Sequence, residues 1–295
     1  MSAIVVNLQA VPRDAASWCD LARRAEAAGF ASLLVPDHPG TCASPFVALA
    51  AAASATRTIR LGSYVANAGV WDPLLLASEV ATLDVISHGR ARLGIGAGHT
   101  SAEWEMRGRE YPSPSERVAE LISVTEATIR LLTGDTVTST GARLDAPRPV
   151  QRVELLVGGN GKQVVEFGSR VADIVSITGL GRTLADGHRH ELDWSTAATD
   201  ERVAWLKASG RSIVIDALVQ AFAVTDDVER EIDLRFAGAA LPPRDVMAAP
   251  YALIGSVPSL AEEMLRHRDR FGFTSFTVRE PAFDAAAAVI ERLAG

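Results

Sequence analysis

Long apolar runs, cysteine pairs and low-complexity linkers are all missing from this chain of 295 residues. No run approaches the ~18 apolar residues of a membrane span, and the N-terminus lacks the basic start of an export signal. The two cysteines, Cys19 and Cys42, have no CxxC spacing, so we expect free thiols and a cytoplasmic protein. A net charge of -7 argues against nucleic acid and anionic membranes as partners.

Apolar, strand-like segments alternate with helical patterns along the whole chain. We expect strands at 3–8, 31–35, 59–66, 90–94, 153–157, 174–178, 213–224 and 275–278, with helices between them. Buried strands in this number predict a single α/β domain over residues 1–295, a (β/α)8 TIM barrel. A doubly wound sheet is the competing architecture. A small hairpin at 136–144 and a polar rim loop at 187–194 are expected insertions, the second at the C-terminal face.

Two glycine clusters follow strands of this pattern, at 94–98 and at 158–161. Glycine lets backbone amides approach a ligand closely, and the start of a helix adds unpaired N–H donors and a positive dipole end. The second cluster, Gly158-Gly159-Asn160-Gly161, therefore predicts a phosphate site and an enzyme with a phosphorylated cofactor. A tight turn between strand and helix explains the same glycines without a ligand.

Polar residues also stand where other predicted strands end, which is where a (β/α)8 barrel carries its function. Asp37 and His38 follow the second strand, Asn67 the third, and His99 the fourth. A histidine with a pKa near neutrality can pass a proton or hydrogen-bond a substrate carbonyl. The alternative is an aspartate that caps a turn beside a bystander histidine.

The order and spacing of these motifs resemble the luciferase-like monooxygenases, in particular the branch that uses the deazaflavin coenzyme F420. The resemblance covers nearly the whole chain. It rests on Asp37-His38, on the strand 61–67, on the helix-to-strand passage 79–90, and on the glycine clusters with the helix that carries Arg117.

The resemblance implies a role for each of these segments. The cofactor ring packs beside the third strand, where a bulge with a non-prolyl cis peptide is expected at Tyr64–Val65, and Asp37 and His38 lie near its reactive edge. His99 stands where sugar-phosphate dehydrogenases of this branch have an acidic glutamate, so that chemistry is not carried over. The implied catalytic residues are His38, His99 and Asp37, and the implied cofactor-binding residues are Tyr64, Val65, Ala66, Asn67, Gly98, Gly158, Gly159, Asn160, Gly161 and Ser176. Nearby Glu103 is a substitute acid, although we expect it on a solvated helix face.

The function that follows is hydride transfer between coenzyme F420 and a small organic substrate, in a homodimer formed by the helices after strands two and three. An apolar or aromatic substrate is favoured because the loops at the C-terminal face carry Trp71, Trp104, Tyr111 and Trp194. The alternative is an FMN-dependent monooxygenase of the same family that uses oxygen. A barrel that binds the cofactor without turnover is the third hypothesis.

Three other readings are disfavoured. A Rossmann fingerprint would follow the first strand and needs a third glycine where His99 stands. A metal site would draw on Asp37, His38, His99, His188 and His190, but no strand carries a His-x-His pair, so we expect no metal. The G-x-S-x-G motif of serine hydrolases is absent.

Overall fold

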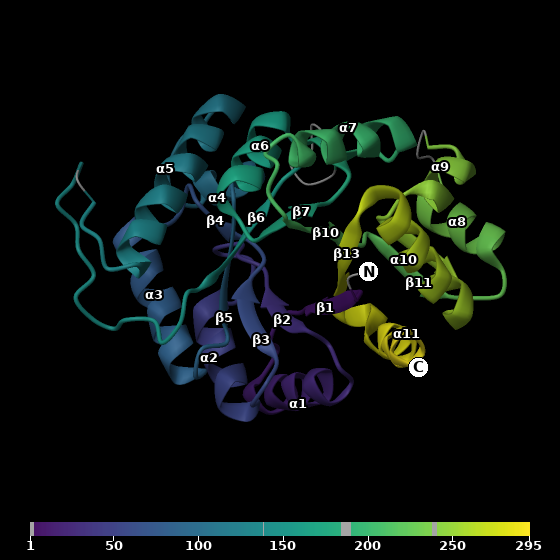
Figure 1. The fold of residues 1–295 in the computed structure, drawn as a ribbon, viewed down its shortest axis with the longest axis horizontal. Helices are drawn as coiled ribbons and strands as arrows, with labels where there is room; N and C mark the ends of the chain where they lie inside the picture. The colour runs from purple at the N-terminus through teal and green to yellow at the C-terminus, as the bar shows by residue number, and fades with distance from the viewer. Residues whose placement is uncertain (1–2, 138, 184–189, 238–240) are drawn as a thin grey trace. The chain divides into compact units, whose positions relative to one another are not determined.

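The computed structural model describes residues 3–137, 139–183, 190–237 and 241–295 (Figure 1). The chain falls into two compact units. The N-terminal unit comprises Ala10–Glu26 and Ser32–Gly158, and the C-terminal unit comprises Met1–Gln9, Ala27–Ala31 and Gly159–Gly295. Among the helices in these described ranges, none has the length and apolar character needed to cross a membrane.

Four parallel strands form the sheet of the N-terminal unit, in the order β2-β3-β5-β6. Their bounds are Ser32–Val35, Arg60–Ser63, Ala91–Gly96 and Glu154–Gly158. A short strand, β4 (Ala66–Asn67), pairs with the end of β5. The helices are α1 (Ala15–Ala27), α2 (Pro45–Ala55), α3 (Pro73–Ile86), α4 (Ser101–Glu105) and α5 (Pro114–Leu132). Every residue of β2 and β5 is buried, which explains why the sequence shows these strands as apolar runs.

The C-terminal unit has its own four parallel strands, in the order β1-β13-β10-β7. Their bounds are Val5–Gln9, Phe273–Arg279, Val214–Leu218 and Ile174–Ile177. The helices are α6 (Lys162–Val171), α7 (Thr196–Lys207), α8 (Val228–Phe236), α9 (Pro243–Ala248), α10 (Val257–Phe271) and α11 (Phe283–Ala294), with a 3-10 turn η1 at Glu280–Ala282. Two strands, β8 (Leu180–Thr183) and β9 (His190–Leu192), pair antiparallel outside this sheet.

Four strands in each unit give eight parallel strands in the described residues, and at least one helix separates each strand from the next along the chain. This is the order of a (β/α)8 barrel, and it confirms the predicted fold class. The predicted strands and helices agree with the observed ones to within a few residues in most places. For example, the helix expected at 14–28 is α1, Ala15–Ala27.

The apolar run 213–224 is not one strand, as the sequence suggested. It divides into β10 and β11 (Ala221–Val224), and β11 leaves the main sheet to pair with β12 (Ala252–Gly255). The break lies at Gln220, whose backbone amide donates to the carbonyl of Tyr251 over 2.7 Å. Figure 1 shows β11 with α8, α9 and α10 in green and yellow. Apolar content alone could not distinguish one long strand from two short ones in different sheets.

The hairpin expected at 136–144 is also wrong, because the described part of this segment contains no strand. A tight loop stands there instead, closed by a bond from the Val137 amide to the Ala142 carbonyl over 2.9 Å. Val137 and Leu144 are buried against Ala77, Ala81 and Leu131 of α3 and α5. The alternating apolar residues therefore anchor a loop by side-chain packing and not by strand pairing.

The helix-to-strand passage that carried much of the family resemblance serves the fold. Asp84 is fully buried and accepts hydrogen bonds from the amides of Val150 at 2.8 Å and Ala91 at 3.3 Å. Arg90 donates to the carbonyls of Ile59 at 2.9 Å and Ala53 at 3.0 Å. These two side chains fix where β5 and β6 enter the sheet, so their buried charges are partnered and structural.

Candidate functional site

Three segments of the N-terminal unit meet beyond the carboxyl ends of their strands. Asp37 and His38 follow β2, Asn67 ends β4, and α4 follows β5. The sequence predicted Asp37, His38, Asn67 and His99 at these positions, and the structure brings the first three into one hydrogen-bonded group with Glu103.

Asp37 is 5% exposed and holds two neighbouring segments. Its Oδ2 accepts from the indole Nε1 of Trp71 at 2.7 Å and from the backbone amide of Asn67 at 3.1 Å. Burial raises the pKa of the Asp37 carboxyl, and these two hydrogen bonds oppose the rise. Asp37 therefore positions Trp71 and β4 and does not cap a surface turn.

His38 is the partly exposed member of the group, with 34% of its side chain accessible. Its Nδ1 lies 2.6 Å from Oε1 of Glu103, and this hydrogen bond raises the pKa of His38 above its ordinary value against the effect of burial. His99 is exposed, and its ring centroid lies 5.7 Å from that of His38, edge to face. A partly exposed imidazole whose pKa is raised is suited to giving a proton to a ligand.

Glu103 is the residue that sequence reasoning misjudged. It is 2% exposed, and its Oε2 accepts from Nδ2 of Asn67 at 2.5 Å, so the expectation of a solvated helix face is wrong. Helix α4 has only five residues, and the side chain of its N-cap Thr100 makes no capping hydrogen bond. Neither hydrophobic periodicity nor a capping motif therefore predicted the burial of Glu103 on this helix. The available signal was position, because Glu103 follows the same strand end that drew attention to His99.

Gly98 explains how these side chains come so close. It has a φ of +71°, and a Cβ there would lie 2.3 Å from Oδ1 of Asn67 and 2.5 Å from the ring of Trp104. The structure thus gives Gly98 a packing role beneath Asn67. Its carbonyl accepts from Nε of Arg117 at 3.1 Å.

Aromatic side chains cover this region. Trp104 is buried and contacts Tyr111 with ring centroids 5.2 Å apart, and the Arg117 guanidinium lies 4.3 Å from the centroid of the Tyr111 ring. The Tyr111 hydroxyl donates to the carbonyl of His99 at 3.0 Å. Trp194, expected in a loop at the same face, is instead 1% exposed in the core of the C-terminal unit, so it offers no surface to a substrate.

The strand expected at 59–66 is interrupted by a cis peptide bond between Tyr64 and Val65, which confirms the bulge that the family resemblance predicted. Tyr64 and Ala66 are buried, and Val65 is half-buried. The Val65 methyl groups lie over Gly96 and Gly158: Cβ atoms at these glycines would stand 2.6 Å and 3.0 Å from them. These two glycines make room for the bulge.

In the C-terminal unit, Gly161 is the N-cap of α6 and places no side chain over the first turn. No heavy atom lies within 4 Å of the position that a Cβ of Gly161 would take. The neighbouring groups are already engaged: the Gly159 amide donates to the Ser176 carbonyl at 3.0 Å, and Asn160 Oδ1 accepts from the Thr178 amide at 2.9 Å.

The Ser176 side chain contacts a buried carboxylate. It is 1% exposed and donates from its hydroxyl to Oδ2 of Asp216 at 2.7 Å. Ser275 and Thr277 donate to the same carboxylate, at 2.7 Å and 2.9 Å to Oδ1. The structure therefore places Ser176 in a buried polar network of the C-terminal unit.

Across the described residues, His, Cys, Asp and Glu side chains form no group of three or more that could hold a metal ion. His188, which the metal hypothesis required, lies outside these residues.

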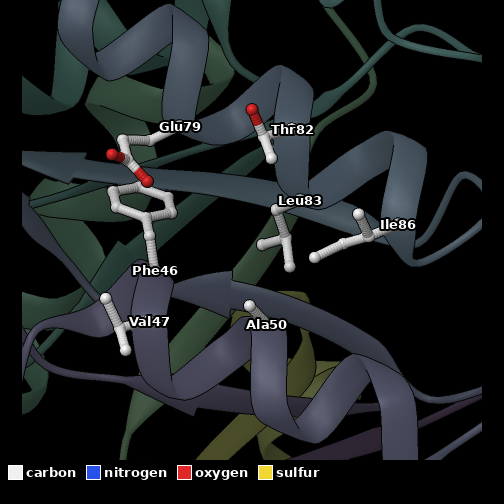
Figure 2. A pocket seen from close by; sticks show the side chains of 7 residues that line it. All are labelled: Phe46, Val47, Ala50, Glu79, Thr82, Leu83 and Ile86. Atoms are coloured by element: carbon white, nitrogen blue, oxygen red, sulfur yellow. The ribbon is translucent and has the colours of Figure 1, made fainter.

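A shallow apolar groove of about 210 Å³ lies between α2 and α3 (Figure 2). Phe46, Val47 and Ala50 line it from α2, and Glu79, Thr82, Leu83 and Ile86 line it from α3. Val47 is 72% exposed and Ile86 is 43% exposed.

Sequence comparison finds relatives of this chain among F420-dependent enzymes. The F420-dependent glucose-6-phosphate dehydrogenase of Beutenbergia cavernae is 27% identical over 97% of this chain and 92% of its own length. The enzyme of the same name from Amycolatopsis mediterranei is 30% identical over 59% of this chain, but the match spans only 56% of that relative.

Solved structures show the same fold. The coenzyme F420-dependent tetrahydromethanopterin reductase of Methanopyrus kandleri superposes with a TM-score of 0.75 at 19% identity, covering 98% of this chain and 97% of that one. The monooxygenase RslO1 of Streptomyces bottropensis gives 0.74 at 20% identity, covering 98% and 97%. The model of the luciferase-like monooxygenase family matches residues 6–202. The chain therefore belongs to the luciferase-like monooxygenase family.

Proposed function

We propose that this protein is an oxidoreductase that transfers a hydride between coenzyme F420 and a small organic substrate. The observation that carries the proposal is the His38 imidazole, held by a buried glutamate at the carboxyl ends of the strands. A hydride transfer to or from a carbon that bears oxygen needs a proton donor or acceptor at that oxygen. Full-length similarity to an F420-dependent dehydrogenase supports the choice of cofactor.

The residues present fit a phosphorylated deazaflavin. The start of α6 offers backbone N–H groups and a positive dipole end with no side chain of Gly161 in the way, which suits a phosphate. The half-buried Val65, between Tyr64 and Ala66, offers an apolar surface for a ring. When bound, the deazaflavin supplies or accepts the hydride.

The chain's own residues orient the reactants and handle the proton. His38 gives its proton to the substrate oxygen during reduction and takes it back during oxidation. Asp37 holds Trp71 and β4 in place through the bonds described above. His99, exposed and near His38, is a second group that can contact a ligand. Trp104 and Tyr111 limit the access of water from one side.

The test is binding of purified protein to F420 and, in parallel, to FMN, followed by cofactor fluorescence and calorimetry. Micromolar affinity for F420 with much weaker binding of FMN is the expected result. The reverse preference would favour an FMN-dependent monooxygenase of the same family. Binding of neither would overturn the cofactor assignment.

The groove between α2 and α3 supports a homodimer as the working form. Exposed apolar residues line it on both helices, with Val47 at 72% and Ile86 at 43% exposure, and exposed apolar clusters of this kind mark association surfaces. A second copy of the chain, with the same apolar face, is the partner we propose.

We also propose that residues 1–295 act as one catalytic domain, in the cytoplasm. The strand order supports the first statement, because each unit supplies four of the eight strands of a barrel. Cys19 and Cys42 are both free thiols, which suits a reducing compartment.

A further inference from the structure

Glu103, Asn67 and the backbone amide of Gly69 continue from His38 as one chain of hydrogen bonds. We propose that Glu103 is a positioning residue that keeps the His38 imidazole protonated and aimed, and that Asn67 fixes Glu103 instead of contacting the cofactor. This inference rests on the proposed function only in assigning the proton of His38 to catalysis. The coupling of the two side chains can be tested without a cofactor.

Both oxygens of the Glu103 carboxylate have hydrogen-bond partners within the protein. Oε1 lies 2.6 Å from Nδ1 of His38, and Oε2 accepts from Nδ2 of Asn67 at 2.5 Å. The side chain is 2% exposed, so water cannot replace either partner. A buried carboxylate without a cation is costly, and a positively charged imidazole is the partner that offsets that cost.

Both polar atoms of the Asn67 side chain already have partners inside the protein. Its side-chain oxygen accepts from the amide of Gly69 at 3.1 Å, its Nδ2 serves Glu103, and the residue is 3% exposed. Gly98 has no Cβ and so leaves room for that oxygen, because a Cβ there would lie 2.3 Å from it. The amide therefore sets the rotation of the Glu103 carboxylate and, through it, the plane of the His38 ring.

Several other groups surround the imidazole. Asp37 precedes it and adds negative charge, which favours the protonated ring, and His99 faces it edge-on at 5.7 Å. The amide of Cys42 donates to the His38 carbonyl at 2.8 Å and places a neutral thiol in the same turn. The carboxylates of Glu103 and Asp37 thus both favour the protonated form of this ring.

The chemical consequence is a defined donor atom. Because Nδ1–H is held by Glu103, Nε2–H is the proton for the ligand. In the reductive direction the Nε2–H bond breaks and an O–H bond forms on the substrate oxygen as its carbon receives the hydride. The neutral imidazole then regains a proton from water. In the oxidative direction the imidazolium first releases its Nε2 proton to water, and the free Nε2 then accepts the hydroxyl proton as the hydride leaves the carbon.

The experiment is a titration of the histidine rings by ¹⁵N-edited NMR in the full chain, with His38 assigned by the loss of its signals in His38→Asn. In the wild type we expect the His38 midpoint above the ordinary 6.5. In Glu103→Gln, which keeps shape but removes charge, it falls by about one pH unit or more. Glu103→Asp, which keeps the charge, restores part of the loss. Glu105→Gln is the matched control, since it removes the same charge from an exposed position of the same helix.

A wild-type His38 midpoint at or below 6.5 would overturn the inference, even if Glu103→Gln fails to fold. An equal fall of the His38 midpoint in Glu103→Gln and Glu105→Gln would also overturn the inference, because loss of a negative charge anywhere on the helix would then explain both shifts. F420 affinity, measured on the same samples, separates this inference from the proposed function. A shifted midpoint in a protein that binds no F420 supports the Glu103–His38 coupling and refutes the cofactor. Normal F420 binding with an unshifted His38 midpoint supports the cofactor and refutes the Glu103–His38 coupling.

Discussion

At the scale of single residues, His267 on α10 links stability to pH. Its side chain is 2% exposed, and burial lowers its pKa to about 4 from 6.5. Glu263 Oε1 lies 3.2 Å from its Nε2 but not in hydrogen-bonding geometry, so burial decides the sign. The unfolded chain binds a proton as the pH falls below 6.5, whereas the folded chain does so only near 4.

We therefore expect the free energy of unfolding to fall between pH 6.5 and pH 4, by about 3 kcal/mol in total from this group. Urea titrations across this range would measure the slope. His267→Leu should remove this part of the slope, while His88→Asn, at an exposed position with a φ of 58°, should leave it. A slope that is equal in all three proteins would refute the assignment.

Gly161 allows the phosphate site to be tested with little effect on the fold. An aspartate is a favourable N-cap, and nothing lies within 4 Å of the new Cβ, so Gly161→Asp should keep or raise the melting temperature. Its carboxylate would occupy the helix start and repel a phosphate, so we expect F420 affinity to fall tenfold or more. Gly161→Ser caps the helix without adding charge, so its F420 affinity should fall much less. Calorimetry would measure both affinities.

At the residue scale, the ends of predicted strands identified polar residues that lie together, while their roles in the site stay predictions. Asp37, His38 and Asn67 all follow buried strands, and the structure brings them together. The sequence could not show which of these polar side chains form hydrogen bonds within the protein. Asn67 and Ser176 were expected to contact a cofactor, but their side chains are bonded inside the fold. Those bonds join residues far apart in the chain, and no local pattern encodes them.

At the scale of elements, Glu26 ties the end of α1 to the start of β3. Its Oε1 accepts from three successive amides, those of Arg57, Thr58 and Ile59, at 2.5–2.9 Å. Burial raises the pKa of this carboxyl, but the three amides outweigh it and lower the pKa to about 2. The stabilisation is complete above the ordinary pKa of 4.5 and is lost as the pH falls toward 2.

Glu26→Gln keeps one acceptor but removes the charge that these amides favour. We expect the unfolding free energy at pH 7 to fall by about 1 kcal/mol, a modest value because the side chain is partly solvated. At pH 2.5 the difference between variant and wild type should largely vanish. Chemical denaturation at both pH values would measure it, with Glu120→Gln, an exposed residue of α5, as the control. A difference that is independent of pH would contradict this account.

Element boundaries were predictable where a long apolar or helical pattern met a clear stop. Helix α5 begins at Pro114, after Ser113 and with Glu116 completing a capping box, and the sequence pattern predicts a helix over about 115–133, within one residue of these bounds. Helix α4 and strand β12 were missed because their five and four residues span too few periods for a pattern to stand out on its own. These short elements carry Glu103 and redirect β11, so the missed pieces matter more for the site than for the fold.

At the scale of the whole molecule, the apolar groove between α2 and α3 predicts self-association. Val47→Glu places a charge on its most exposed apolar residue, at 72% exposure, and should weaken the dimer by tenfold or more while leaving the subunit folded. Sedimentation equilibrium over a concentration series would measure this. Leu234→Glu, at 68% exposure on α8, is a matched surface change and should leave association intact. A wild-type chain that remains monomeric would refute the proposal.

The contact of Val65 with Gly96 and Gly158 limits how this protein can vary. Its two methyl groups occupy the volume that a Cβ at either glycine would need. Gly96→Ala alone should therefore be strongly deleterious, yet it should be rescued when Val65 is shortened to alanine in the same chain. The effects of Gly96 and Val65 are thus epistatic, and mutagenesis libraries that change one position at a time will score Gly96 as invariant. Libraries that change them jointly would reach ring surfaces of a different shape.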